Sequence, residues 1–237
     1  MKVAVVNYTG TVGKTTIAAH LLAPRMNGAE VFAVESINET AQGLGVDVEM
    51  IRGEKFRDLF KKLMLLDDAI IDVGASNVEA FLNGLVKFED SHLEIDYFVV
   101  PVTSGTKEQK ETIAVITALS ELGIPAERIR VVFNRVDEDV ADEFAPILQF
   151  AKKSKTCVAN TEAAIFESDV FDLMSMRKVT ISGALEDQTD YKAKAREEKA
   201  NGNDPKVLDR YTDLQSIKLG VKPLQRNLDA VFSVLFK

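Results

Sequence analysis

VAVVNYTGTVGKTT, residues 3–16, is an apolar strand that runs into a glycine loop ending in Gly-Lys-Thr. Loops of this kind turn successive backbone N–H groups toward a polyphosphate and add the positive end of the helix that follows. Lys14 is expected among the β- and γ-phosphates, and the Thr15 hydroxyl on the Mg²⁺ that bridges them. The stretch therefore predicts a phosphate-binding loop between the first strand and the first helix of an α/β fold.

The loop departs from the common pattern at its first residue, because Tyr8 stands where a glycine is usual. Its spacing resembles the deviant loop K-G-G-x-G-K-T of the ParA/MinD ATPases, with Thr9 in place of the signature lysine and a threonine in place of the second glycine. In that family the signature lysine reaches the phosphates of the partner in a nucleotide-dependent homodimer, so Thr9 argues against cross-subunit catalysis. The expected nucleotide contacts in the loop are Gly10, Thr11, Val12, Gly13, Lys14, Thr15 and Thr16.

Composition excludes several functional classes. The 237 residues carry a net charge of −8, which argues against electrostatic coating of nucleic acid, although residues 177–237 are mildly basic. The single cysteine, Cys157, forms neither an internal disulfide nor a zinc site. The chain has no signal-peptide pattern and no apolar run of membrane-spanning length, so we expect a cytoplasmic protein without membrane contact.

Apolar strand-like runs alternate with helix-like stretches along the chain. This order predicts one three-layer α/β/α domain, residues 1–237, with a mostly parallel central sheet. Residues 186–205 are rich in charge and poor in large apolar side chains, which indicates a mobile arm or an exposed helix. Residues 223–236 have apolar side chains at helical spacing and predict a C-terminal amphipathic helix. The expected strands are residues 2–6, 30–34, 69–73, 97–102, 130–134 and 156–159.

The third expected strand ends in Asp72, followed by Gly74. An aspartate at the carboxyl end of a buried parallel strand is the form of a Walker B residue, which binds Mg²⁺ directly or through water. Alone this pattern is common, but together with the upstream loop it predicts that Thr15 and Asp72 form the metal site. Lys14 and Asp72 are therefore expected to be catalytic.

The second expected strand leads into Glu35, with Ile37 and Glu39 shortly after it. ParA/MinD proteins have an Asp-x-Asp pair at this place, and its second aspartate lies near the attacking water. Glu35 aligns with the first of these aspartates and is a catalytic candidate. Ile37 occupies the place of the second, so hydrolysis is expected to be slow, and Glu39 is at best a nearby substitute.

The fifth expected strand ends in Asn134 and Arg135, which resemble the base-recognition strand of the same ATPases. An asparagine amide carries both a donor and an acceptor, enough to pair with adenine. Asp137 completes a sequence close to the Asn-Lys-x-Asp of guanine readers, so ATP is favoured and GTP stays open. The other wall of the base pocket is expected after the sixth strand, and its residues are Ala159, Asn160 and Thr161. His20 and His92 have no neighbours in sequence that indicate a catalytic triad or a metal site, so no chemistry is assigned to them.

Longer segments of the sequence, mostly in its amino-terminal half, resemble the StbB plasmid-stability proteins. The resemblance lies in VGKTTIA at residues 12–18, HLLAPR at residues 20–25, VESIN at residues 34–38, DVGASNVE at residues 72–79 and VVFN at residues 131–134. In that family Ser or Thr normally replaces the signature lysine. The resemblance implies a weak ParA-like ATPase that acts as an ATP-dependent switch in plasmid stability, partition or conjugative DNA transfer. It also implies a small DNA-binding partner protein from the same operon, so that contact with DNA is indirect.

Two other functions remain open from the sequence. A small-molecule ligase of the dethiobiotin-synthetase type has a similar fold, and its phosphate loop also lacks the signature lysine. No cluster of Lys, His or Arg near the loop ends indicates a second substrate, which argues weakly against this function. A nucleotide-binding scaffold that does not hydrolyse is the second alternative, because Ile37 removes the usual water-positioning carboxylate.

Overall fold

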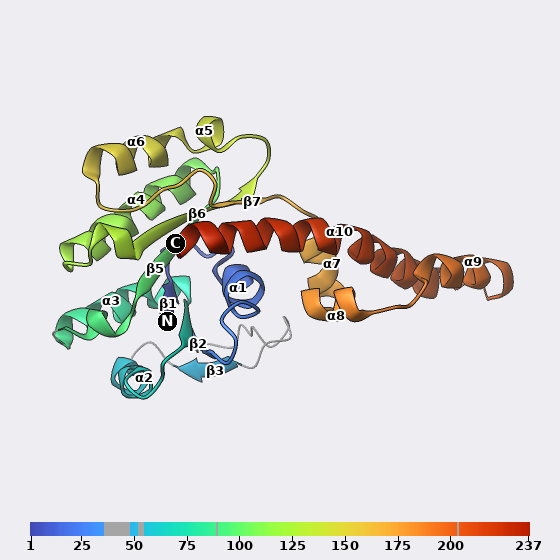
Figure 1. Cartoon of the computed structure of the whole chain (residues 1–237), viewed down its shortest axis with the longest axis horizontal. Coiled ribbons are helices and arrows are strands. Elements are labelled where there is room, and N and C mark those ends of the chain that lie inside the picture. Colours follow the sequence, from blue (N-terminus) through green and yellow to red (C-terminus); the bar gives the residue numbers. More distant parts are fainter. Residues whose placement is uncertain (36–47, 52–54, 89, 203) are drawn as a thin grey trace.

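A computed structural model describes residues 1–35, 48–51, 55–88, 90–202 and 204–237. Its centre is a seven-stranded sheet in the order β3-β2-β4-β1-β5-β6-β7, and every adjacent pair of strands is parallel. Helices cover both faces (Figure 1), so the predicted three-layer α/β/α architecture is confirmed. The strands are β1 (Lys2–Val5), β2 (Glu30–Val34), β3 (Val48–Ile51), β4 (Ala69–Val73), β5 (Tyr97–Val102), β6 (Ile129–Val136) and β7 (Ala164–Phe166).

The central strands are near-continuous apolar runs because both of their faces are covered. All five residues of β4 are buried, and so are the last three of β1. Alternate side chains of each strand enter different layers, so Ala4 packs into one core and Val5 into the other. Two separate apolar layers therefore hold the sheet in place.

One layer lies under four helices on one face of the sheet. These are α2 (Phe56–Leu63), α3 (Val78–Lys87), α4 (Thr106–Glu121) and α6 (Ala145–Ser154). The other layer is formed by η1 (Ile17–Leu22), α7 (Val170–Arg177), α8 (Ile181–Glu186) and the long α10 (Pro205–Leu235). The remaining helices are α1 (Lys14–Thr16), η4 (Ala75–Asn77), η5 (Ser91–Glu94), η6 (Ala126–Arg128), α5 (Val140–Glu143) and α9 (Tyr191–Asn201).

The two sheet edges differ from the sequence expectation. β3 was not expected, because its four residues include exposed positions and lack a clear apolar pattern. At the other edge, residues 156–159 make only one bridge, between Val158 and Arg130, and the strand there is β7. Both ladders are short, and a short strand leaves little periodic signal.

Helix α10 begins eighteen residues before the expected start at residue 223. Asp204 caps it by accepting the Lys206 N–H at 2.9 Å, and Pro205 occupies its first turn. Pro223 is exposed within the helix, where loss of one N–H donor is tolerated. The apolar residues expected on its inner face, Leu224, Leu228, Val231 and Leu235, are all buried.

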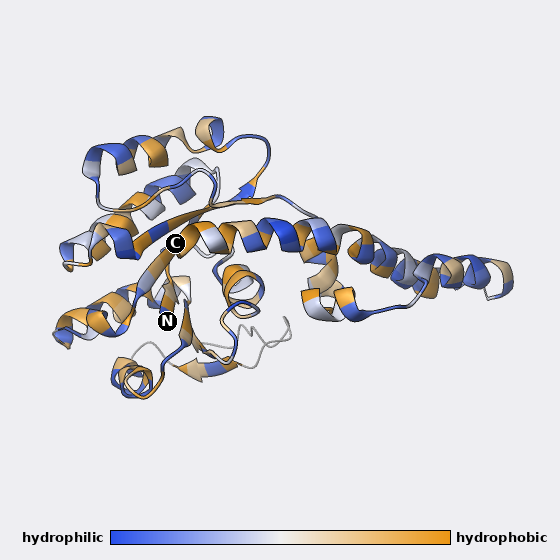
Figure 2. Ribbon diagram, viewed as in Figure 1, coloured by the Kyte–Doolittle hydropathy of each residue, from blue (hydrophilic) through white to orange (hydrophobic). Residues whose placement is uncertain are grey.

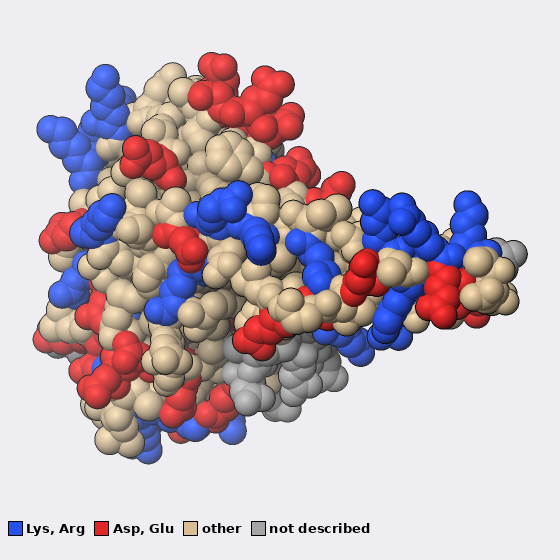
Figure 3. All heavy atoms as spheres, turned by 45° about the vertical axis from the view of Figure 1, so that its right-hand side comes forward, with Lys and Arg blue, Asp and Glu red and all other residues tan. Residues whose placement is uncertain are grey.

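Helix α9 packs on the first half of α10, and the pair extends away from the body as an arm (Figure 1). Residues 186–205 contain the end of α8, all of α9 and the start of α10. Figure 2 shows α9 as mostly hydrophilic, and Figure 3 shows Lys and Arg gathered over the arm with Asp and Glu among them. Arg177 of α7 anchors the arm through ion pairs to Asp209 and Asp213 of α10.

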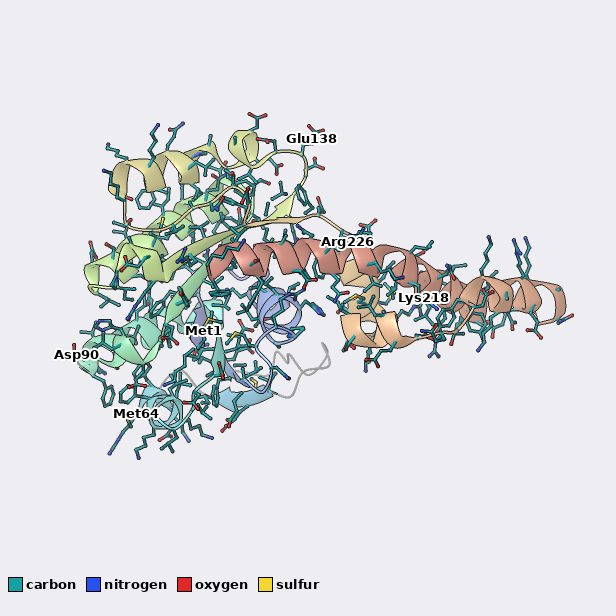
Figure 4. All side chains as sticks on the ribbon, in the orientation of Figure 1. Met1, Met64, Asp90, Glu138, Lys218 and Arg226 are labelled. Carbon is teal, nitrogen blue, oxygen red and sulfur yellow. The ribbon has the colours of Figure 1, made fainter. Side chains whose placement is uncertain are left out.

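Side chains along α10 mark where the arm meets the body. Lys218 and Arg226, labelled in Figure 4, lie two turns apart on this helix. Lys218 Nζ donates to the Thr189 carbonyl at 2.8 Å, which joins the loop between α8 and α9 to α10.

Within the described ranges, the chain has no helix with the length and apolar content needed to cross a membrane.

Burial along α10 generates a paired test of packing. Leu228 is 1% exposed and Leu219 is 70% exposed on the same helix. Leu228→Ala removes buried methyl groups and leaves a cavity, so the free energy of unfolding should fall by about 3 kcal/mol. Leu219→Ala is the control and should change it by less than about 0.5 kcal/mol. Urea denaturation measures both, and equal losses would contradict the placement of α10.

Candidate functional site

The phosphate loop joins β1 to α1 at the carboxyl edge of the sheet. Gly13, the residue before α1, has φ +81°, and a Cβ at this position would collide with the side-chain amide of Asn134. Only glycine fits this combination of backbone angle and close approach. Lys14 is 4% exposed, and its Nζ donates to the Thr9 carbonyl at 2.6 Å across the loop.

Asp72 and Thr15, which the sequence assigns to one metal site, are in contact beside this loop. β1 pairs with β4 so that Val5 lies opposite Asp72, which brings the end of β4 next to the start of the loop. The Thr15 hydroxyl donates to Asp72 Oδ2 at 2.7 Å. The other oxygen, Asp72 Oδ1, is buried and has no hydrogen-bond partner in the described part of the chain.

This donor set fits Mg²⁺. A carboxylate and a hydroxyl are hard oxygen ligands, and Mg²⁺ in nucleotide sites takes one or two protein ligands besides phosphates and water. A buried carboxylate oxygen without a partner is costly, and a cation would offset that cost. Burial raises the pKa of Asp72, while the hydrogen bond from Thr15 and the charge of Lys14 oppose the shift.

Lys14 is an ammonium held in a poorly solvated position. Burial lowers its pKa, and the negative charges of Asp72 and Glu35 oppose that shift. A poorly solvated charge gains more from a polyanion than an exposed lysine does. The loop therefore holds a cation ready for phosphate oxygens.

Glu35 joins the same group from the end of β2. Its backbone N–H donates to the Ile51 carbonyl at 3.0 Å, and its side chain lies against Gly74, where a Cβ would come within 3.1 Å of Glu35 Cγ. Three strand ends thus bring Lys14, Asp72 and Glu35 together. Ile37 and Glu39 lie outside the described residues.

Asn134 lies beside the phosphate loop and is engaged with it. Its side-chain Nδ2 donates to the Val12 carbonyl at 2.9 Å, and the residue is 5% exposed. The amide donor that the sequence assigns to the base therefore holds the loop. Arg135, the next residue of β6, has φ 55° at an irregularity in the β6–β7 pairing, and its side chain is exposed.

A cavity of about 180 Å³ opens next to Gly13 and Asn134. Thr16 and Arg135 also line it, and its far wall comes from residues after β7 and from α7. Its size suits a ring system better than a larger molecule, since drug-sized pockets begin near about 300 Å³. The lining residues are Gly13, Thr16, His20, Asn134, Arg135, Phe166, Glu167, Ser168, Asp169, Phe171, Asp172 and Ser175.

Ala159, Asn160 and Thr161, which the sequence assigns to one wall of the base pocket, lie away from this cavity. These residues precede β7 and do not line the cavity. Asn160 closes a tight turn, because its carbonyl accepts the Ala163 N–H at 2.9 Å and its side chain accepts the Glu162 N–H at 3.0 Å. The strand that reaches the carboxyl edge is β7, so the residues that follow it take that place.

The loop residues Gly10 and Thr11 are exposed and Val12 is fully buried. The loop therefore presents its middle to solvent and is fixed at its end.

Sequence reasoning missed three ring-bearing cavity residues, His20, Phe166 and Phe171. Only the short run from Ala163 to Phe166, followed by polar residues, signals the strand end that places Phe166.

His20 lies in η1, a π-helical segment directly after α1. It is 5% exposed, its ring is 5.7 Å from that of Phe171, and burial lowers its pKa to about 4. Arg25 stabilises the end of this segment by donating to the carbonyls of His20 and Leu21, and it pairs with Asp229 of α10. The helix after the loop is thus fixed to the opposite layer.

Comparisons with known proteins show a shared fold. No protein-family model matches the chain, and no curated protein matches it in sequence. Apo McdA from Cyanothece superposes with a TM-score of 0.59 at 15% identity over 99% of this chain and 98% of that one. An ATP complex of a McdA variant gives 0.56 at 17% identity over 99% and 96%.

MinD from Pyrococcus furiosus gives a TM-score of 0.53 at 15% identity, covering 93% of this chain and 99% of MinD. MinD from Aquifex aeolicus gives 0.52 at 16% identity, covering 93% and 97%. At these identities the similarity shows the fold alone. The chain therefore has the fold of the ParA/MinD P-loop ATPases.

The glycine requirement can be tested with two substitutions in one loop. Gly13→Ala combines positive φ with the collision against Asn134, so the free energy of unfolding should fall by about 2 kcal/mol. At Gly10 a Cβ meets nothing within 4 Å, so Gly10→Ala should cost less than about 0.5 kcal/mol. Chemical denaturation measures both, and a neutral Gly13→Ala would show that the loop has another conformation.

Burial of His20 predicts a pH dependence. Between pH 6.5 and about 4 the unfolded chain binds a proton at His20 that the folded chain does not, so stability falls as pH falls through this window. Between pH 7 and pH 5 the wild-type protein should lose about 2 kcal/mol more than His20→Gln. His92→Gln is the control and should behave as wild type. Equal losses in wild type and His20→Gln would contradict the buried neutral imidazole.

Proposed function

We propose that this protein is an ATP- and Mg²⁺-dependent switch, a weak ATPase that acts in plasmid stability, partition or conjugative DNA transfer. One observation carries the nucleotide assignment. A buried, poorly solvated Lys14 lies beside Thr15 and an Asp72 whose second oxygen is buried without a described partner. A cation and a metal-type donor pair at the end of one loop suit a nucleoside triphosphate with its metal.

Binding requires a small change at one side chain. Lys14 exchanges the Thr9 carbonyl for phosphate oxygens, which carry full negative charge and attract it more strongly. Thr15 and Asp72, which are joined by a hydrogen bond, would hold Mg²⁺ with their hydroxyl and carboxylate oxygens. Mg²⁺, when bound, neutralises charge between the β- and γ-phosphates. Successive loop N–H groups, with Gly13 leading into α1, supply the remaining contacts.

The nucleotide state reaches the ends of two strands at the same edge of the sheet. The Gly74 N–H donates to the Val34 carbonyl at 2.9 Å, and Gly74 lies against Glu35, so the end of β2 touches the residue after β4 beside Asp72. A change at Asp72 therefore acts on Glu35 and Gly74 together. Glu35 is the candidate for orienting water, and turnover is expected to be slow with Ile37 in place of the family's aspartate.

ATP is favoured over GTP. The side chain of Asp137, which would serve a guanine reader, is not among the cavity-lining residues, and its backbone N–H donates to Glu143 at 3.0 Å. McdA, whose fold is similar, has been crystallised as an ATP complex. We assign the base to the cavity beside Arg135, between the loop and the residues after β7.

The assembly we propose is a nucleotide-dependent homodimer that binds a small DNA-binding protein from the same operon, so that DNA contact is indirect. This part rests on the resemblance to StbB proteins. A MinC:MinD complex from Aquifex aeolicus, in which the MinD-like fold has a protein partner, is compatible with it. Light scattering in the presence of a non-hydrolysable ATP analogue tests the dimer. An unchanged monomer that binds the analogue would favour a ligase-type enzyme or a passive scaffold instead.

Two substitutions separate binding from metal-dependent turnover. Lys14→Ala should weaken binding of a non-hydrolysable ATP analogue by about a hundredfold, because a charge-assisted contact to two phosphates is lost. Asp72→Asn should keep binding within about tenfold, remove its Mg²⁺ dependence and abolish phosphate release. Calorimetry and a phosphate-release assay measure these effects.

Lys110→Ala, at an exposed lysine of α4, is the matched control and should bind as wild type does. Normal analogue binding by Lys14→Ala would overturn the proposed function. Normal phosphate release by Asp72→Asn would remove Asp72 from the metal site.

A further inference from the structure

Asn7, two residues after the end of β1, is a polar side chain with no exposed surface. Its Nδ2 donates to the Pro101 carbonyl at 2.8 Å and to Thr112 Oγ1 at 2.7 Å. Its Oδ1 accepts the Thr9 N–H at 2.9 Å. Both amide hydrogens and one lone pair are used, so the side chain has one orientation.

These contacts continue in both directions as a chain of hydrogen bonds. On one side, the Thr9 carbonyl accepts the Lys14 ammonium. On the other, the Thr112 hydroxyl donates to the Glu108 carbonyl at 2.8 Å, one turn earlier in α4. This series of hydrogen bonds therefore runs from the lysine of the phosphate loop to the first turns of α4, the helix that follows β5.

We propose that Asn7 is a positioning residue of the phosphate loop, and that Asn7 and Thr112 together carry a change at Lys14 to the first turns of α4. The inference rests on the proposed function, because Lys14 leaves the Thr9 carbonyl when phosphate oxygens take it. Loss of that contact alters the peptide groups around Thr9, whose N–H Asn7 holds. A buried donor or acceptor left without its partner is costly, so such groups move together.

The start of α4 is placed to pass this change on. Gln109 lies one turn before Thr112 on the same buried face, and its Nε2 donates to the carbonyls of Ser104 at 2.8 Å and Glu143 at 3.0 Å. Glu143 in turn accepts the N–H of Glu138, labelled in Figure 4, at 2.9 Å. Ser104 and Lys107 are exposed at the same edge of the sheet. The surface at residues 104–107 therefore differs between the protein with an occupied phosphate loop and the protein with an empty one.

The test compares two Thr→Val substitutions on one helix. Thr112→Val removes the hydroxyl that accepts from Asn7 and keeps the side-chain shape. Thr117→Val is the matched control, because Thr117 also donates to the carbonyl four residues earlier, at 2.8 Å, but is exposed and touches neither Asn7 nor the loop. Thr112→Ser keeps the hydroxyl and should behave as wild type in every measurement.

Two measurements are made on the full chain. The first is hydrogen exchange of the Thr9 amide without nucleotide, which should be about tenfold faster in Thr112→Val than in Thr117→Val. The second is affinity for a non-hydrolysable ATP analogue with Mg²⁺, which should be about tenfold weaker in Thr112→Val alone. In wild type the analogue should also slow exchange at residues 104–112, and Thr112→Val should remove that effect.

The outcomes separate this inference from the proposed function. Identical Thr9 exchange and affinity in the two valine variants would overturn the role of Asn7 and Thr112. A defect in Thr112→Val that serine does not restore would also overturn it, because the hydroxyl would not be the cause. Faster Thr9 exchange in Thr112→Val, with no analogue binding by wild type, would support the positioning role and overturn the nucleotide function.

Discussion

The parallel pairing of β1 with both β4 and β5 is the constraint on which the site depends. Val5 lies opposite Asp72 on one side and opposite Val99 on the other. This register sends the loop after β1, the end of β4 and the end of β5 to one edge of the sheet. A shift by one residue would exchange the two faces of β1 and place core side chains in the wrong layer. The apolar layers therefore fix where the phosphate loop, with Lys14 and Thr15, lies beside the Asp72 carboxylate.

Electrostatics at this edge is a balance between burial and pairing. Lys14 and Asp72 are both less than 5% exposed. Burial lowers the pKa of Lys14 and raises the pKa of Asp72, and the charge of each group opposes the shift of the other. Two poorly solvated groups of opposite sign persist because each reduces the cost of the other. Polyphosphate has the charge opposite to that of Lys14, and a metal ion has the charge opposite to that of Asp72. Binding of both therefore reduces the electrostatic cost of burying these two groups.

Sequence reasoning predicted the parts that local patterns encode. The glycine loop, the buried strand that ends in Asp72 and the three-layer architecture all follow from residues near one another in the chain. Apolar spacing alone predicts a helix from residue 223, whereas α10 begins at Pro205 and continues through Pro223. The capping carboxylate of Asp204 marks this earlier start.

The remaining parts depend on contacts that no local pattern contains. Asn134 donates to Val12, 122 positions away, so its use within the loop is visible only after folding. β7 has three residues, too few to show a period, and it decides which loop forms the wall of the cavity. His20 looks isolated in the sequence because its neighbours, such as Phe171, come from another segment.

The arm gives the molecule an uneven distribution of charge along its length. Residues 177–237, which include the arm together with α8 and the part of α10 that packs on the body, contain 12 Lys and Arg against 9 Asp and Glu, whereas the whole chain has net charge −8. Such a particle has a dipole moment, and an electric field turns it before contact. At physiological salt such long-range electrostatic orientation acts only within about 8 Å. The direction of approach is therefore set by ionic strength as well as by shape.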